Sequence, residues 1–156
     1  MKLATKTIYA PRILLDIARH NEQGPVPSGH TSHRQGISAK YLDQIIRPLK
    51  KGQIVTSVRG PKGGQVLMKR PEEITLGRIL RLMEGDIRID GQAEISDAQA
   101  SRDEDRLRRI WAEAIRTFYH SLDSITLADL LNDQSPLDGT TSRKLPQGGG
   151  RGKKGL

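Results

Sequence analysis

A basic, glycine-rich segment between two strand-like segments limits the fold more than any other feature of this sequence. Residues 54–58 and 65–69 are rich in strand-forming side chains, and residues 59–64 between them read Arg-Gly-Pro-Lys-Gly-Gly. Two such segments joined by a short connection of glycine and proline are typical of an antiparallel hairpin. We therefore expect a β-hairpin with a cationic tip in a chain whose other segments show helical patterns.

Helical patterns lie on both sides of this hairpin. Residues 7–20 have apolar side chains at helical spacing, with Thr7 as the expected N-cap. Pro11 removes one backbone hydrogen bond and favours a later start or a bend. Residues 21–29 have the composition of a loop, and residues 30–35 favour at most a short helix.

Gly36 precedes a more regular helix, which we expect to run from a Ser38 N-cap to about residue 51. Its inward stripe consists of Tyr41, Leu42, Ile45, Ile46 and Leu49. Two helices around a glycine-containing turn are typical of a helix-turn-helix, although many small helical domains share this outline. The hairpin that follows makes the prediction more specific, because a hairpin in this position is a wing.

The second half of the sequence favours three further helices. They are expected over residues 75–84, which Gly85 ends, over residues 101–121 and over residues 126–131, with a loop over residues 86–100. The longest helix has one apolar face, made of Leu107, Ile110, Trp111, Ala114, Phe118 and Leu122. Its charged outer face is most simply solvated.

Charge is divided unevenly along the chain. Residues 1–70 contain 13 Lys and Arg against 3 Asp and Glu, residues 71–134 contain 8 against 14, and residues 135–156 contain 5 against 1. A basic first half before an acidic segment is typical of a polyanion-binding module joined to a part that does not contact the polyanion. A solvated basic surface would have the same composition.

The helix after Ser38 carries the side chains that a DNA-reading helix needs. Burial of its apolar stripe leaves a polar face, which consists of Lys40, Asp43, Gln44 and Arg47. In the major groove a glutamine pairs with adenine, a carboxylate accepts from cytosine, and a lysine reaches guanine or phosphate. The alternative interpretation is an ordinary surface helix.

The tip of the hairpin is the more specific element. Gly60 and Gly63 allow the backbone to approach a groove closely. Arg59 and Lys62 supply the positive charge that suits a narrow minor groove. Arg59 is the strongest single candidate for DNA contact, and the alternative is a structural turn with incidental charge.

Composition indicates that a partner subunit buries part of the apolar surface. Hydrophobic residues make up 35% of the 156 residues and aromatic residues 3%, which is low for a self-sufficient monomer. We expect a mostly α-helical fold with a small hairpin wing: a winged helix-turn-helix and a long C-terminal dimerisation helix. The expected divisions are a DNA-binding domain at 1–85, a loop at 86–100, dimerisation and terminal helices at 101–134, and a disordered basic tail at 135–156.

Several classes of protein are excluded or disfavoured by what the sequence lacks. The chain contains no cysteine, which excludes disulfides, thiolate redox chemistry and cysteine-ligated zinc or iron–sulfur sites. There is no run of about 18 apolar residues and no signal-peptide core, so we expect a cytoplasmic protein without a membrane partner. No phosphate loop, paired carboxylates or nucleophile with a base partner can be identified, which argues against an enzyme.

Six short segments have a more specific pattern: residues 24–27 (GPVP), 34–38 (RQGIS), 41–42 (YL), 58–64 (VRGPKGG), 74–77 (ITLG) and 125–130 (ITLADL). They closely resemble the Rrf2 family of bacterial winged helix-turn-helix transcription regulators, above all its iron–sulfur cluster regulators. The resemblance covers roughly residues 1–135. It implies a homodimer on double-stranded DNA, a long helix that crosses to the other subunit, and a wing whose Arg59 enters the minor groove.

The residues expected to contact DNA are therefore Ser38, Lys40, Tyr41, Asp43, Gln44, Arg47, Arg59, Gly60, Lys62 and Gly63.

The departures from the family concern its metal chemistry. Members with a cluster bind it through three cysteines and a histidine, and an ungapped alignment places those positions at Gln92, Ala98, Glu104 and Leu107. None of the four supplies the family's ligand, so we expect no cluster, no other cofactor and an effector of a different, unidentified kind.

A histidine pair is the second departure. Thr31 and Ser32 replace an apolar pair usual in the family, and His30 and His33 flank them. The His-x-x-His spacing could hold a metal, but a satisfied or exposed pair is the simpler interpretation, because no second ligand pair exists.

Three functions compete. The first is a DNA-binding repressor that sits on an imperfect palindrome as a homodimer, with its wings in flanking minor grooves. The second is a protein-interaction module whose acidic residues 86–105 engage an enzyme, since some cluster-free members of the family are controlled by a metabolic enzyme. The third, an enzyme, has no candidate site.

Overall fold

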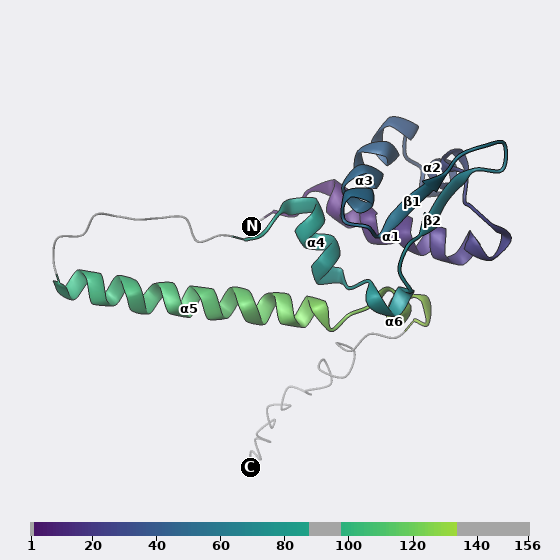
Figure 1. The fold of residues 1–156 in the computed structure, drawn as a ribbon. Coiled ribbons are helices and arrows are strands. Elements are labelled where there is room, and N and C mark those ends of the chain that lie inside the picture. Colours follow the sequence, from purple (N-terminus) through teal and green to yellow (C-terminus); the bar gives the residue numbers. More distant parts are fainter. Residues whose placement is uncertain (1, 88–97, 134–156) are drawn as a thin grey trace, which may run out of the picture.

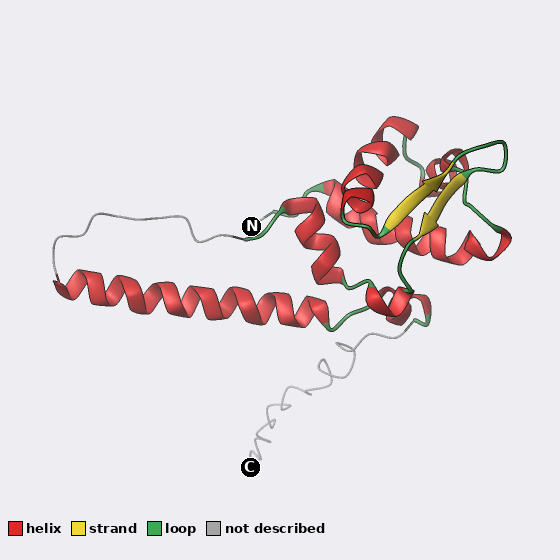
Figure 2. Ribbon diagram, viewed as in Figure 1, coloured by secondary structure: helices red, strands yellow, loops and turns green. Residues whose placement is uncertain are grey.

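The computed structural model describes residues 2–87 and 98–133, with side chains from residue 102 onward in the second range (Figures 1 and 2). The expected tail at 135–156 and residues 88–97 of the expected loop lie outside these residues. Residues 98–100 were expected in that loop, but they form the first turn of the long helix, which begins at Ala98. Its elements are α1 (Thr5–His20), a 3-10 turn (Asn21–Gln23), α2 (Ser28–Gln35), α3 (Ala39–Lys51), β1 (Val55–Val58), β2 (Gly64–Leu67), a second 3-10 turn (Pro71–Glu73), α4 (Leu76–Glu84), α5 (Ala98–Asp123) and α6 (Leu127–Leu131). The prediction of a mostly helical fold with one hairpin is confirmed.

Helix α1 forms the centre of the winged domain. It packs against α2, α3, α4, α6 and β2, and its side chains Ile13, Leu14 and Ile17 are completely buried. The apolar stripe of α3 joins the same cluster through Leu42 and Ile45. Removal of this apolar surface from water is the main force that holds the elements together.

The start of α1 differs from the prediction, because Thr7 is not its N-cap. The helix begins at Thr5, no side chain of the preceding residue caps it, and Thr7 lies buried inside the first turn. Glu84, distant in sequence, accepts hydrogen bonds from the Ala4 amide, at 2.7 Å, and from the Thr7 hydroxyl. The helix also continues through Pro11, because packing of the buried face outweighs the loss of one backbone hydrogen bond.

Of the two helices of the helix-turn-helix, α3 has the predicted bounds and α2 does not. Helix α2 begins at Ser28, earlier than expected, and ends at Gly36, whose φ of 65° places it in the left-handed region that glycine favours. Helix α3 follows the prediction closely, since the Ser38 hydroxyl accepts from the Tyr41 amide at 3.1 Å.

The hairpin pairs β1 with β2 in antiparallel register, with Ser57 opposite Gln65 and Val58 opposite Gly64. Both strands are shorter than the predicted segments. The outer edge of β2 has a further partner, because Val26 from the loop before α2 forms an isolated bridge with Gln65.

Helix α5 extends away from the winged domain as a long arm (Figure 1). After it the chain returns to the domain, where the amides of Leu76 and Leu127 donate to the carbonyls of Ile125 and Ile74 at 2.9 and 2.8 Å. Leu127 of α6 thereby enters the buried cluster around α1. Within the part of the chain that is described, no helix is both long and apolar enough to cross a membrane.

Candidate nucleic-acid interface

The exposed face of α3 carries the polar side chains that the sequence assigned to base reading. Leu42, Ile45, Ile46 and Leu49 are buried, which leaves Lys40, Asp43, Gln44 and Arg47 exposed on the other side. Ser38 uses its hydroxyl as the helix cap, and Tyr41 is only half-buried. The structure therefore brings all six α3 candidates to one end or one face of a single helix.

Two of these side chains bind each other. The Arg47 Nε and Nη2 atoms both contact Asp43 Oδ2, at 2.8 and 2.7 Å, and both side chains remain largely exposed. An exposed pair four residues apart on a helix contributes about 0.3–0.5 kcal/mol. The pair is therefore weak enough to open when a base edge or a phosphate competes for either partner.

The tip of the hairpin is a tight turn that two glycines permit. Gly60 has a φ of 117°, which favours glycine, and the Gly63 amide donates to the Gly60 carbonyl at 2.9 Å. A Cβ at Gly63 would lie 2.3 Å from the Val58 carbonyl oxygen. Side chains at these two positions would therefore change the shape of the turn.

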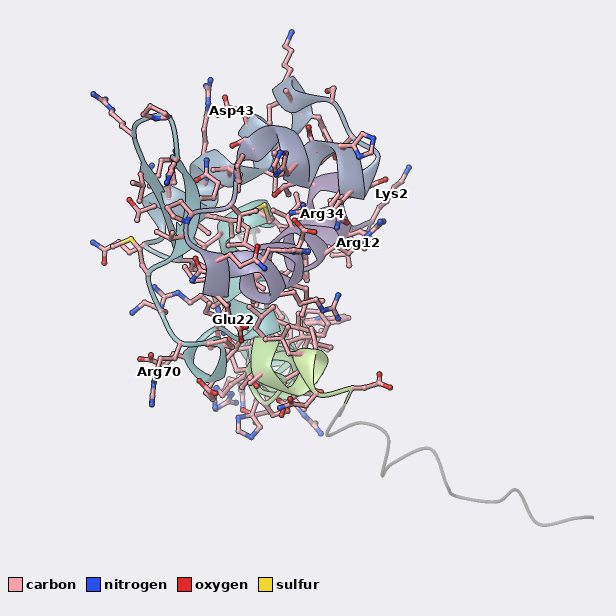
Figure 3. All side chains as sticks on the ribbon, turned by 90° about the vertical axis from the view of Figure 1, so that its right-hand side faces the viewer. Lys2, Arg12, Glu22, Arg34, Asp43 and Arg70 are labelled. Carbon is pink, nitrogen blue, oxygen red and sulfur yellow. The ribbon has the colours of Figure 1, made fainter. Side chains whose placement is uncertain are left out.

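Arg59 and Lys62 are the cations of this tip. Both are exposed, and neither has a hydrogen-bond or ion-pair partner among residues 2–87 and 98–133. The tip and the beginning of α3 lie on the same side of the domain (Figure 1). Figure 3 likewise shows Asp43 at the end of the domain where the hairpin loop lies.

An aromatic and cationic pair beside α3 is a feature that sequence reasoning missed. The Tyr9 ring meets the Tyr41 ring edge-on, with centroids 6.0 Å apart, and the Arg12 guanidinium lies 4.8 Å from the Tyr9 centroid. Tyr9 and Arg12 are three residues apart on α1, so helical spacing could have placed them together but not beside Tyr41.

A partly buried ion pair joins α1 to α2. Arg34 donates through Nε and Nη2 to both oxygens of Asp16, at 2.7 and 2.8 Å. Asp16 is 5% exposed. Burial alone would raise the pKa of this carboxyl, but the hydrogen bonds and charge of Arg34, with further contributions from Thr31 and His20, together outweigh burial and hold the pKa below its usual value.

The apolar face of α5 is the second candidate interface. Leu107, Ile110 and Trp111 are 56%, 54% and 60% exposed, and Ala114 and Phe118 continue the same face toward Leu122. Phe118 and Leu122 also line an apolar groove of about 290 Å³, together with Leu3, Ile8, Pro11 and Leu76. One apolar surface thus extends from the arm onto the winged domain.

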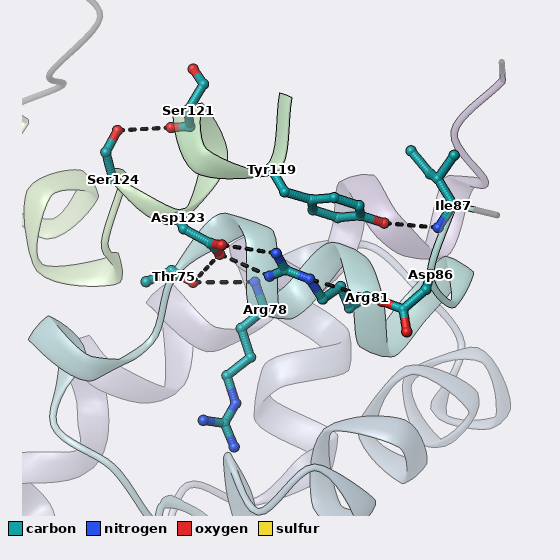
Figure 4. Close-up of polar contacts among 9 residues, drawn as sticks. All are labelled: Thr75, Arg78, Arg81, Asp86, Ile87, Tyr119, Ser121, Asp123 and Ser124. Carbon is teal, nitrogen blue, oxygen red and sulfur yellow. Dashed lines mark hydrogen bonds and ion pairs between the residues drawn. The ribbon is translucent and has the colours of Figure 1, made fainter. Parts of the chain in front are cut away.

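An arginine fixes the angle at which α5 leaves the domain (Figure 4). Arg81 of α4 donates to both oxygens of Asp123, at 2.9 and 2.8 Å, and its guanidinium lies 4.1 Å from the centroid of Tyr119. The Tyr119 hydroxyl accepts from the Ile87 amide at 3.1 Å. The segment after α4 is thereby connected directly to α5.

The donor groups of this chain do not fit a cysteine-ligated cluster. Of the four aligned positions, Glu104 pairs with Arg108 at 2.9 Å and Leu107 is an exposed apolar side chain. The positions of Gln92 and Ala98 carry no described side chain. In the described ranges, no three His, Asp or Glu side chains come together as a metal site, and His30 and His33 are both exposed.

Comparison with known proteins agrees with this geometry. A model of the Rrf2 family, described as an iron-dependent transcriptional regulator, matches residues 3–133. Protein rrf2 of Nitratidesulfovibrio vulgaris is 39% identical over 138 residues, which are 86% of this chain and 90% of the relative. The HTH-type transcriptional regulator IscR of Serratia proteamaculans is 35% identical over 137 residues, with 88% and 83% covered.

Solved structures lead to the same family. CymR, the global cysteine regulator of B. subtilis, superposes with a TM-score of 0.67 at 31% identity, over 86% of this chain and 99% of CymR. IscR of T. potens superposes with a TM-score of 0.63 at 33% identity, over 95% and 94% of the two chains. The chain therefore belongs to the Rrf2 family, whose members are DNA-binding transcription regulators rather than enzymes.

Proposed function

We propose that this regulator is a repressor that binds an imperfect palindrome as a homodimer and that takes its signal from something other than an iron–sulfur cluster. The observation that carries the proposal is a pair of exposed cations, Arg59 and Lys62, which have no ion-pair partner among the described residues. Their glycine turn lies on the same side of the domain as the beginning of α3. A helix for the major groove and a cationic loop for the flanking minor groove are then presented to one duplex.

Base reading is assigned to α3 and shape reading to the wing. Gln44 pairs with adenine, Asp43 accepts from cytosine, and Lys40 reaches guanine or phosphate. Arg59 enters the minor groove, where a narrow width strengthens the attraction for its charge. Residues 1–85 form the DNA-binding unit, and residues 101–134 form the dimerisation unit.

The homodimer rests on the apolar face of α5. Three large apolar side chains that are each more than half exposed would be unusual on a helix surrounded by water. A second copy can cover them with the same face and can extend into the groove beside Phe118. Two-fold symmetry of the protein then requires two-fold symmetry of the operator, and a dimer across a promoter represses by blocking polymerase.

Loss of cluster sensing rests on donor chemistry. The chain has no cysteine, and the aligned Glu104 is paired with an arginine. The regulator therefore needs another input and acts on DNA in the cytoplasm. We assign the basic residues 135–156 no more than nonspecific attraction to DNA.

Genomic footprinting at physiological salt tests the proposal. The native protein should occupy discrete palindromic sites, and Arg59→Ala should lose them, whereas Arg19→Ala, which removes an equal charge from the end of α1, should keep them. Affinity in vitro should fall by orders of magnitude between about 50 and 200 mM salt if about six or more phosphates are neutralised. Absence of discrete sites for the native protein would contradict the proposal and would favour the protein-interaction module.

A further inference from the structure

Gln65 lies where the wing meets the helix-turn-helix. It is 7% exposed, and its backbone pairs with Ser57 across the hairpin. On its other edge, the Val26 amide donates to the Gln65 carbonyl at 2.9 Å, and the Gln65 amide donates to the Val26 carbonyl at 2.7 Å. The wing is therefore hydrogen-bonded to the segment that leads into α2.

The side chain of Gln65 makes a second connection at the same place. The Ser57 hydroxyl donates to Gln65 Oε1 at 2.9 Å, and Gln65 Nε2 donates to the Ser28 hydroxyl at 3.1 Å. Ser57 belongs to β1 and Ser28 is the first residue of α2. An amide suits this position because it accepts from one hydroxyl and donates to the other at once.

The backbones are also in close approach beside Gln65. A Cβ at Gly64 would lie 2.4 Å from the carbonyl carbon and oxygen of Val26. A two-stranded hairpin is marginally stable by itself, so this attachment determines how the strands are oriented. Loss of the directional hydrogen bonds would leave the strands paired while the wing could tilt against α2.

We propose that Gln65 is a positioning residue that holds the wing at the angle at which Arg59 reaches the minor groove while α3 occupies the major groove. The inference rests on the proposed function. It assigns to Gln65 no contact with DNA, so the whole effect of this side chain on binding passes through the tip of the wing.

A double-mutant cycle tests this role. The probe is a labelled duplex that the native protein selects from a random-sequence library, and binding is measured by fluorescence anisotropy at several salt concentrations. Arg59→Ala should weaken binding about tenfold or more, and Gln65→Met should weaken it about three- to tenfold. In a background that carries both Arg59→Ala and Lys62→Ala, Gln65→Met should cause no further loss, because the tip contacts that it positions are already absent.

The salt dependence separates positioning from general damage to the fold. Gln65→Met should reduce the slope of log affinity against log salt in the same direction as Arg59→Ala but by less, because the tip cations then contact the DNA less often. Gln23→Met makes the same chemical change on an exposed turn and should leave both affinity and slope unchanged. Ser28→Ala removes the same connection from the α2 side and should reproduce Gln65→Met.

The outcomes distinguish this inference from the proposed function. Selection of no sequence by the native protein would overturn both. A selected sequence with equal losses from Gln65→Met in the two backgrounds, or with an unchanged salt slope, would overturn only the role of Gln65. If thermal unfolding shows that Gln65→Met does not fold, the Ser28→Ala cycle decides by the same criteria.

Discussion

The winged domain and helix α5 bury their apolar side chains in opposite ways. In the winged domain, α1 and α3 place Ile13, Leu14 and Ile45 in a core that excludes water completely. In α5, Ile110 and Trp111 are more than half exposed, although they lie on an equally regular apolar face. The domain completes its core with its own elements, and the arm does not.

This difference separates two kinds of stability. Contacts inside the winged domain form in one chain, so they do not depend on protein concentration. Burial of Leu107, Ile110 and Trp111 on α5 requires another surface, and in the proposed homodimer it depends on protein concentration. Four substitutions test whether the molecule divides in this way.

Ile13→Ala should have the largest effect. The side chain is completely buried at the centre of the core, so its truncation should cost about 2–5 kcal/mol of unfolding free energy. Urea unfolding should show an equal loss at low and high protein concentration. Met68→Ala, at a side chain that is 53% exposed, should stay within about 0.5 kcal/mol. A loss of similar size for both variants would argue that the core is not where the structure places it.

Asp16→Asn should have the next largest effect and lower the unfolding free energy by about 1–2 kcal/mol near neutral pH. The loss is limited because the side chain of the partner Arg34 is one-third exposed, so water can solvate its charge when the pair is broken. The pKa of Asp16 is lower in the folded state than its unfolded value of 3.8. The carboxylate therefore stabilises the fold above that value, and its contribution is lost as the pH falls through the folded-state pKa.

The difference in unfolding free energy between the native protein and Asp16→Asn should accordingly be constant well above pH 3.8 and should shrink as the pH falls below 3.8. Asp43→Asn, which breaks an exposed pair, provides the control and should change stability little. A difference that persists unchanged at low pH would show that the pair with Arg34 is not its cause.

Trp111→Ala should act on association and leave the winged domain intact. Large aromatic side chains at the centre of an interface often contribute at least about 1.4 kcal/mol, which is a tenfold change in the dissociation constant. Sedimentation equilibrium should detect this weakening, whereas Arg109→Ala on the opposite face should dimerise normally. A native protein that is monomeric at all concentrations would remove the proposed distinction between core and arm.

Asp123→Asn should have the smallest effect, below about 1 kcal/mol, because both partners of the pair with Arg81 are more than one-third exposed. The hydrogen bonds from Arg81 hold the pKa of Asp123 below its usual value against the opposing effect of burial. Its contribution is present above the unfolded pKa and disappears as the pH falls through the folded pKa. Thermal unfolding should show a small difference at pH 7 that shrinks as the pH falls below 3.8.

Several features of the fold could be predicted because they depend on residues near one another in the sequence. The caps at Ser38, Thr75 and Thr126 each use a backbone amide three residues away, and the hairpin follows from two short segments and the turn between them. The apolar face of α5 follows from helical periodicity in the same way. The absence of cysteine excluded the usual cluster ligands without any structure.

Features that join distant residues could not be predicted. Glu84 replaces Thr7 as the group that binds the start of α1, and the two are 77 residues apart. Arg34 and Asp16 are 18 residues apart, and Gln65 and Ser28 are 37 apart. A charge or amide in the sequence does not identify its partner, because many distant residues have the same chemistry.

The sequence by itself determined the order and the approximate positions of the helices and strands, which faces are apolar, where positive charge collects and which metal ligands are absent. Local hydrogen bonds and side-chain periodicity act over a few residues, so they can be identified in the chain before it folds. Only the tertiary structure decided that β2 is attached to α2 through Gln65, that Arg81 holds α5 at its angle, and that no other element of the described residues covers Ile110 and Trp111 of α5. These contacts depend on the position of whole elements, which the packing of the core around α1 fixes.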